Sequence, residues 1–421
     1  MVLALLNSFM ASIARKNLFE DIPRFLVAQA GIMFAVSLVT IQTGILSGFS
    51  RSTTSVIDNS QADIWVAASE MVYLELTLPL PAGMVAQAQE VDGVVRAEAL
   101  SIRGATWRSD NGEISPVRLI GFSPNGQLFI PGELVSGNWS DLQEPYSFIL
   151  DESNLDSLDL GQLGEEASIG SLPARLIGLT QETQSIASSP FLFTSLESAN
   201  AYVTSGLTST TSCRLVSGNL QCTNVYQRSQ SSTPPARPAP LTASDTITYV
   251  LVQAASGQDL ELLKQRLEEA LPGTRAYTKA EISSQTRDYW QQRTGLGFVL
   301  GLGATVGVIV GMVIVGQILY SSVSDHLKEF GTLKAMGASD WLIYRVIIEQ
   351  ALWMAVLGYA PSMGLCLALG AWTFATQGIM ILITPVTAAG VLGITVIMCV
   401  GSALFAIQKV THVDPAIVFK V

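Results

Sequence analysis

The sequence predicts an α-helical membrane protein with four transmembrane helices and a large mixed α/β domain between helices 1 and 2. The 421 residues are 49% hydrophobic and only 14% charged, whereas about a quarter of the residues of an ordinary soluble domain are charged. The mean hydropathy of +0.40 agrees with this class. The apolar residues also gather in four runs that approach or exceed the roughly 20 residues needed to span a bilayer.

The four apolar runs divide the chain into spans and connecting segments. We place the transmembrane helices at residues 25–47, 291–320, 346–376 and 386–408. The other segments are an N-terminal amphipathic helix, a large domain, a charged segment, a short loop and a tail, at residues 1–24, 48–290, 321–345, 377–385 and 409–421.

The N-terminal segment differs from a cleaved signal peptide, in which basic residues precede the apolar ones. Here Arg15 and Lys16 follow the apolar residues, which recur at helical spacing. This pattern predicts a helix that lies on the membrane surface, and a disordered start is the alternative. The apolar residues of the pattern are Leu3, Leu6, Met10 and Ile13.

The positions of Lys and Arg predict the orientation, because cytoplasmic segments are enriched in them. They occur in residues 1–24, 321–345 and 409–421, whereas loop 377–385 has none. We therefore expect both termini in the cytoplasm and the large domain outside it. This domain holds more Asp and Glu than Lys and Arg, which accounts for the net charge of −11. Its acidity argues against nucleic acid as a partner, because phosphates bind Lys and Arg.

The extracytoplasmic domain is predicted to alternate strands and helices. Ser256 and Asp259 form a predicted capping box at the start of its last helix, and the two strand–helix units at either end predict a compact two-part domain. The strands are expected at residues 62–67, 94–107, 117–121, 174–179, 246–252 and 275–278, and the helices at 81–90 and 259–270.

An insertion rich in Ser, Thr and Pro interrupts this domain at residues 205–245. It contains Cys213 and Cys222, and an oxidising compartment would favour a disulfide between them, with two free thiols as the alternative. Such a bond would tie down one hairpin of the insertion. Cys366 and Cys399 lie in predicted spans, where cysteine packs as a small hydrophobe.

Helical stalks are predicted between this domain and the membrane. Residues 47–60 and the whole stretch 279–336 contain no proline. The second stretch therefore predicts one helix that runs unbroken from the domain into the second span, since proline would break it. Paired stalks of this kind could transmit movement across the membrane.

Several kinds of chemistry are absent from the sequence. There is no G-x-x-x-x-G-K-[ST] loop for ATP phosphates, and the two histidines stand too far apart in sequence to predict a metal site. We therefore expect no cofactor, no metal and no catalytic residue. Glycines in the second span give repeated G-x-x-x-G spacings, which allow close helix approach either within the chain or between subunits. They are Gly297, Gly301, Gly303, Gly307 and Gly311.

The charged segment between the second and third spans is predicted to form an amphipathic helix. Gly337 is expected to end it, and Ser339 or Asp340 to cap the next helix. Such a helix could occupy a groove of another protein, or it could lie on lipid headgroups. Its apolar stripe consists of Val323, Leu327, Phe330, Leu333 and Met336.

A resemblance to a known family bears on that choice. The run EFGTLKAMGA at residues 329–338 resembles the cytoplasmic motif of the FtsX/MacB-like permeases of ABC transporters, and VDPAIVFK at 413–420 resembles their C-terminal motif. The resemblance is closer to DevC, a heterocyst-type exporter permease, at residues 289–298, 311–320 and 325–337. The insertion with its cysteines departs from the DevC pattern.

The resemblance implies a homodimeric permease, not itself an enzyme, in a bacterial inner membrane. It implies a separate ABC ATPase subunit, a periplasmic adaptor and a TolC-like outer-membrane channel, with a lipid, glycolipid or other amphiphile as cargo. A regulator of a cell-wall hydrolase like FtsX, a lipoprotein-releasing permease like LolC/LolE and a plain membrane anchor are the alternatives. The residues implied in coupling to the ATPase are Leu327, Glu329, Phe330, Leu333, Lys334, Met336 and Gly337.

Overall fold

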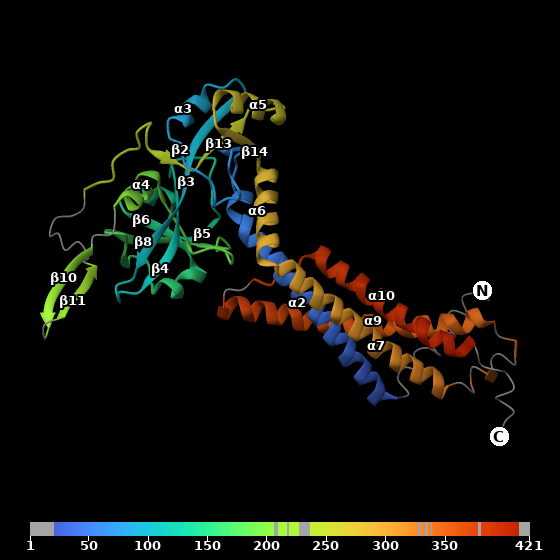
Figure 1. Cartoon of the computed structure of the whole chain (residues 1–421). Coiled ribbons are helices and arrows are strands. Elements are labelled where there is room, and N and C mark those ends of the chain that lie inside the picture. The colour runs from blue at the N-terminus through green and yellow to red at the C-terminus, as the bar shows by residue number, and fades with distance from the viewer. Residues whose placement is uncertain are drawn as a thin grey trace. The chain divides into compact units, whose positions relative to one another are not determined.

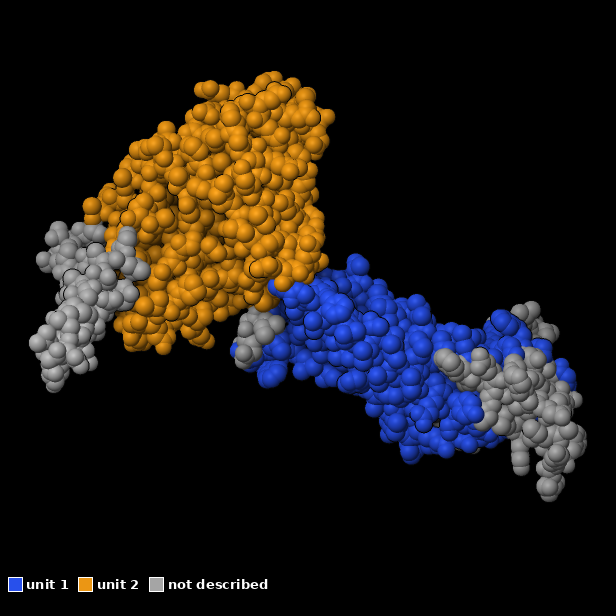
Figure 2. All heavy atoms as spheres, viewed as in Figure 1, with its two compact units in different colours: residues 1–48, 294–421 blue, residues 49–293 orange. Residues whose placement is uncertain are grey.

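The chain forms two compact units in a computed structural model (Figures 1 and 2). Unit 1 comprises residues 1–48 and 294–421, and unit 2 comprises residues 49–293. The structure describes residues 21–205, 209–216, 219–226, 236–326, 329, 331–332, 336–337, 339–377 and 380–411, and for 209–226 the backbone alone.

Four long helices have the length and composition to cross a membrane, which confirms the predicted four spans. Each of the four lies wholly in unit 1 except α2, which continues without a break into unit 2 at Phe49. The continuity follows from its sequence, since no proline interrupts it after Pro23. The helices are α2 Ile22–Asp58, α7 Leu296–Asp325, α9 Asp340–Gln377 and α10 Pro385–Thr411.

Small and branched residues form the core of unit 1, so that the four helices approach closely. The core is shared by all four helices. Its members include Ala28, Ile32 and Ala35 of α2, Val315 and Leu319 of α7, Ala351 and Ala355 of α9, and Cys399 and Ala403 of α10.

Unit 2 is built on a mixed ten-stranded sheet, which confirms the predicted α/β domain between the first two spans. The strands run in the order β14-β1-β13-β3-β4-β9-β6-β8-β5, with β7 pairing to β3 and β8. In chain order they are β1 Ile64–Ala68, β3 Val94–Arg108, β4 Ile114–Phe122, β5 Glu133–Ser136, β6 Ser147–Asp151, β7 Glu166–Ile169, β8 Leu172–Gln181, β9 Phe191–Ser195, β13 Tyr249–Ala254 and β14 Thr274–Thr278.

Helices and short strands complete unit 2. Two small antiparallel pairs, β2 with β12 and β10 with β11, stand apart from the large sheet. The bounds are α3 Met84–Gln89, α4 Leu196–Thr204, α5 Leu260–Ala270, α6 Lys279–Thr294, β2 Leu80–Pro81, β10 Ser209–Val216, β11 Asn219–Tyr226 and β12 Thr246–Ile247. Short 3-10 helices occur at Trp139–Gln143, Glu152–Asn154 and Asp156–Leu158.

Strand β1 is buried on both faces, which places it between two helical layers. On one face Ile64 and Val66 pack in a cluster with Leu263 and Leu267 of α5. On the other face Trp65 packs in a cluster with Val56 and Ile57 of α2 and Ile282 of α6. Because side chains of a strand alternate between faces, the stretch IWVA holds the end of α2 and the start of α6 against one side of the sheet.

The two predicted strand–helix units belong to one sheet and one helical layer, and they do not form two separate parts of the domain. Strand β3, which follows α3, pairs with β13, which precedes α5. Val250 of β13, Ala88 of α3 and Leu267 of α5 lie in one buried cluster. Both helices therefore cover the same face of the sheet.

Two sequence-based expectations in this region are wrong in detail. Asp259, and not Ser256, is the N-cap of α5, because its carboxylate accepts hydrogen bonds from the N–H groups of Glu261 and Leu262. The helix expected to run unbroken from the domain into the second span is instead interrupted at Gly295, between α6 and α7. Gly295 has φ 60°, a left-handed conformation that glycine adopts readily and that ends helices.

Glu281 links the start of α6 to α5. Its carboxylate accepts a hydrogen bond of 2.7 Å from the N–H of Thr278 and bonds of 2.8 Å from Lys264 Nζ, while its own N–H donates to Thr278 Oγ1 at 3.2 Å. Thr278 and Glu281 therefore form a capping box. Burial would raise the pKa of Glu281, but the bonds from Lys264 and Thr278 outweigh it and lower the pKa below the usual 4.5.

Glu281→Gln should lower the free energy of unfolding by about 1 kcal/mol near neutral pH, since one cap and one half-exposed ion pair weaken. A carboxylate with a lowered pKa stabilises the fold above its usual pKa and loses this effect as the pH falls through the lowered value. The difference from wild type should therefore shrink below pH 4.5. Thermal unfolding of the full chain in micelles at several pH values checks this, with the more exposed Glu261→Gln as the control. A difference that does not change with pH would contradict it.

Candidate functional site

The predicted coupling segment lies between α7 and α9, and the structure describes part of it. Leu327, Phe330, Leu333 and Lys334 lie outside the described residues. Glu329, Met336 and Gly337 are described. The described residues of the segment include the exposed side chains of Met336, at 72%, and Trp341, at 71%.

Gly337 has φ 91°, a left-handed conformation that a β-branched or bulky residue rarely adopts. The N–H of the preceding Met336 still donates to the carbonyl of Thr332 at 3.0 Å, as in a helical turn. The chain then enters α9 at Asp340. The glycine therefore stands where one helical turn ends and the next helix is about to begin.

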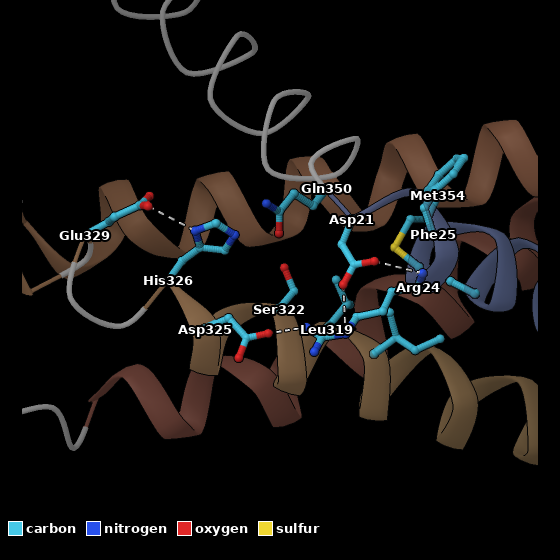
Figure 3. A pocket seen from close by; sticks show the side chains of 12 residues that line it. Asp21, Arg24, Phe25, Leu319, Ser322, Asp325, His326, Glu329, Gln350 and Met354 are labelled. Carbon is cyan, nitrogen blue, oxygen red and sulfur yellow. Dashed lines mark hydrogen bonds and ion pairs between the residues drawn. The ribbon is translucent and has the colours of Figure 1, made fainter.

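A cavity of about 430 Å³ opens in unit 1 beside this segment (Figure 3). Charged groups from the start of α2 and the end of α7 meet around it, and α9 contributes Gln350 and Met354. Its walls are formed by Asp21, Arg24, Phe25, Ala28, Ile318, Leu319, Ser322, Asp325, His326, Glu329, Gln350 and Met354.

Arg24 joins the first and second spans at this cavity. Its guanidinium forms an ion pair with Asp325 at the end of α7 and another, at 3.0 Å, with Asp21. His326 Nδ1 lies 3.2 Å from Glu329 Oε1. The Arg24–Asp325 pair joins the start of α2 to the end of α7, and the His326–Glu329 contact lies within the segment that follows α7. Sequence reasoning missed this cluster, although a basic residue at the start of one span and an acidic residue at the end of the next are a visible signal.

The glycines of α7 fall into two groups by what surrounds them. A Cβ at Gly303 would lie 2.3 Å from Gln42 Nε2, one at Gly307 would lie 2.8 Å from Leu38 Cδ2, and one at Gly311 would lie 2.7 Å from Ala35 Cβ. These three glycines pack against α2 of the same chain. By contrast, a Cβ at Gly297 or Gly301 would meet no described atom within 4 Å.

Glycines of α2 make an equally close contact that sequence reasoning missed. The N–H of Leu382 donates to the carbonyl of Gly44 at 3.0 Å, and a Cβ at Gly48 would lie 2.0 Å from the carbonyl oxygen of Met380. The chain between α9 and α10 thus approaches α2 at two glycines. Their G-x-x-x-G spacing is the signal that could have indicated it.

Gly311→Val should destabilise unit 1 by about 1–3 kcal/mol, the usual cost of overpacking. Met398 is flexible and can move away, but Ala35 Cβ is fixed to the backbone of α2. Gly301→Val is the matched control. It changes the helix propensity by the same amount, but its side chain meets no described atom within 4 Å. Thermal unfolding in lipid nanodiscs measures both variants, and an equal loss at the two positions would refute the packing role of Gly311.

The backbone of the insertion places Cys213 directly opposite Cys222 in the antiparallel pair β10–β11. The side chains of these strands lie outside the described part, so the disulfide stays a prediction. A mass about two units lower before reduction than after it would support the bond. Cys366 and Cys399 are buried free cysteines, as their place in the spans predicts.

The described residues hold no group of three or more His, Cys, Asp or Glu that could bind a metal. The features that the structure does show are charged contacts at one end of α2 and α7, closely packed glycines along these helices, and a continuous α2.

Comparison with known proteins identifies the class of this fold. The model for the MacB-like periplasmic core domain matches residues 25–270, and the model for the FtsX-like permease C-terminal region matches residues 301–415. The first match covers more than half of the chain. The chain therefore belongs to the FtsX-like, MacB-like permease family of ABC transporters, as its motifs predict.

Individual relatives are distant. An uncharacterized ABC transporter permease of Mycobacterium tuberculosis is 22% identical over 395 residues, which cover 93% of this chain and 94% of that relative. A pyoverdine export ATP-binding/permease protein of Pseudomonas fluorescens is 25% identical over 177 residues, 40% of this chain. The matched part spans only 26% of that relative. The predicted kinship to DevC stays a prediction.

A solved structure of the periplasmic region of MacB from Actinobacillus actinomycetemcomitans is also similar. It shares 11% sequence identity with a TM-score of 0.34, over 54% of this chain and 94% of that one.

Proposed function

We propose that this permease transmits ATP-driven movement from a separate ABC ATPase to its large domain, and so expels a lipid, glycolipid or other amphiphile. It would act as a homodimer in the bacterial inner membrane. A periplasmic adaptor and a TolC-like channel would carry the cargo onward. The family supports the ATPase partner. The Lys and Arg residues of the short segments 1–24, 321–345 and 409–421, against none in loop 377–385, support the place of the large domain outside the cytoplasm.

One observation carries the proposal: α2 is a single helix from Ile22 to Asp58. Near its start, Arg24 contacts the end of α7 at the coupling segment. At its other end Asp58 accepts a hydrogen bond of 2.5 Å from Ser283 of α6. A continuous helix resists bending, whereas Gly295 interrupts the α6–α7 path. We infer that α2 carries the movement and Gly295 acts as a joint.

The test breaks α2 without touching either end. Ser50→Pro removes one backbone donor and kinks the helix interior, and Ser50→Ala is the control. The full permease would be reconstituted with its ATPase in nanodiscs, with spin labels at Gln162 of both copies. In the control, ATP with vanadate should change the distance between labels. In Ser50→Pro the distance should stay fixed while the ATPase still binds and hydrolyses ATP.

Two results would count against the proposal. A normal distance change in Ser50→Pro would remove α2 as the transmitting element. Failure of the wild-type permease to bind any ABC ATPase encoded with it would remove the transporter function itself.

The topology gives a separate prediction. With the four native cysteines replaced, Gln162→Cys should react with an impermeant maleimide added to the outside of spheroplasts, and Ser339→Cys should react only after lysis. Both positions are exposed, so access to the reagent decides the result. Labelling of Ser339→Cys from outside would reverse the orientation.

A further inference from the structure

Unit 2 presents an exposed apolar loop, residues 69–79, beside the end of α6. Val72, Leu76 and Leu78 are 42%, 50% and 54% exposed. The loop has no Lys or Arg. A single exposed leucine is common on protein surfaces. Three exposed apolar side chains on one loop become informative if the loop is held in a fixed conformation.

The loop is held firmly. Glu75 points inward, where it pairs with Arg118 at 2.6 Å and accepts a hydrogen bond of 2.6 Å from Ser188. The N–H of Leu76 donates to the carbonyl of Tyr73 at 2.9 Å, which closes a tight turn. The carbonyl of Leu74 accepts a bond of 2.7 Å from the buried Tyr249 hydroxyl. The exposure of the apolar side chains is thus imposed by inward-facing polar contacts.

The loop is fastened to the last turns of α6. Tyr73 stacks on Tyr289 with ring centroids 4.2 Å apart and meets Trp290 edge-on at 5.4 Å. Gln285 Nε2 donates to the carbonyls of Met71 and Val72 at 3.2 and 3.1 Å. Loop and helix end therefore move as one body.

The chain itself ties this body to the membrane surface. Trp290 stands six residues before Leu296, the first residue of span α7. At 1.5 Å per helical residue this is about 9 Å, comparable to the headgroup layer on each side of the hydrocarbon core. Tyr and Trp are also the residues enriched at this layer. The chain length alone, whatever the orientation of unit 2, keeps the aromatic cluster near it.

We propose that loop 69–79 contacts the lipid headgroups of the leaflet at which α7 begins, and that it favours zwitterionic over anionic lipid. The apolar side chains supply the contact. Glu70 lies on the loop and Asp288 beside it on α6, both exposed, and the loop has no Lys or Arg, so the loop itself disfavours anionic headgroups. This contact does not depend on the cargo or on the ATPase.

The test places an environment-sensitive NBD fluorophore on the loop. Leu76→Cys would be labelled in the full permease lacking native cysteines, in nanodiscs of phosphatidylcholine with a nitroxide on the headgroup or high on the acyl chain. Leu262→Cys on α5 is the matched control: its leucine is 44% exposed, and α5 packs at the opposite, N-terminal end of α6 through Lys264 and Glu281.

We expect a blue shift and loss of fluorescence at position 76 with the nitroxide lipid, and neither at position 262. Exchange of part of the lipid for phosphatidylglycerol should reduce the effect at 76. Leu78→Cys gives a second reading if the first variant folds poorly. No quenching at 76 or 78 in folded protein would overturn the proposal, and so would equal quenching at 262. If a protein partner covers the loop instead of lipid, positions 76 and 78 should show no quenching.

Discussion

Phe330→Ala should weaken binding of the ATPase by about 2 kcal/mol, a loss of roughly 30-fold, since truncation of a buried aromatic anchor removes much of the energy of an interface. Phe330 occupies the middle of the apolar stripe predicted for the coupling helix. Lys334→Ala should cost less, because charges at an interface rim contribute little. Co-purification with the ATPase and ATPase activity in nanodiscs measure both variants. Membrane insertion should be unchanged, because Phe330 lies outside the spans.

A second variant tests the turn that follows the stripe. Gly337→Leu places a bulky residue at φ 91°, where strain costs about 1–3 kcal/mol. The segment should then adopt a less strained turn, which changes the direction of the predicted apolar stripe. Coupling to the ATPase should therefore fall even though Phe330 itself is unchanged. Normal ATPase binding and coupling in both variants would mean that the segment only lies on the lipid surface.

The spans and the domain between them could be predicted from sequence because their signals are local. An apolar run long enough to cross a bilayer has few other uses, and strands such as Ile64–Ala68 carry their branched residues within one short run. The position of each strand within the sheet was not predictable, because β1 pairs with β13 and β14, which lie about two hundred residues later in the chain.

The candidate site was only partly predictable for a related reason. The motif around Gly337 is contiguous in sequence, and its glycine could be recognised as a turn. The ion pair between Arg24 and Asp325 joins residues three hundred positions apart, and only the packing of α2 on α7 brings them together. The division of the α7 glycines into packed and open ones depends on the same packing.

The break at Gly295 shows a different limit of prediction from sequence, namely where a helix ends. Absence of proline was a sound argument for helix, and α2 bears it out across its whole length after Pro23. Glycine costs a helix about 1 kcal/mol relative to alanine and also allows a left-handed turn. In α7 the other glycines stay helical, so sequence alone could not tell which of them would end the helix.

Arg118→Met should destabilise unit 2 by about 3 kcal/mol, the largest single effect on stability that we expect. Glu75 is almost wholly buried, with a side chain 5% exposed, and Arg118 is 26% exposed. Removal of the guanidinium leaves a buried carboxylate that, among the described residues, keeps the hydrogen bond from Ser188. Breaking such a buried pair costs about 3–5 kcal/mol.

Two comparisons make the effect of Arg118→Met specific. Arg51 and Glu182 form a pair of nearly the same length, 2.7 Å, but their side chains are 47% and 48% exposed. Arg51→Met should therefore cost less than about 1 kcal/mol, because water already screens that pair. The double variant Glu75→Gln with Arg118→Met should recover part of the loss, since the unpaired charge is gone. Denaturant unfolding of the full chain in micelles, followed by near-UV circular dichroism, measures all three. Equal losses for Arg118→Met and Arg51→Met would show that burial does not decide the strength of these pairs.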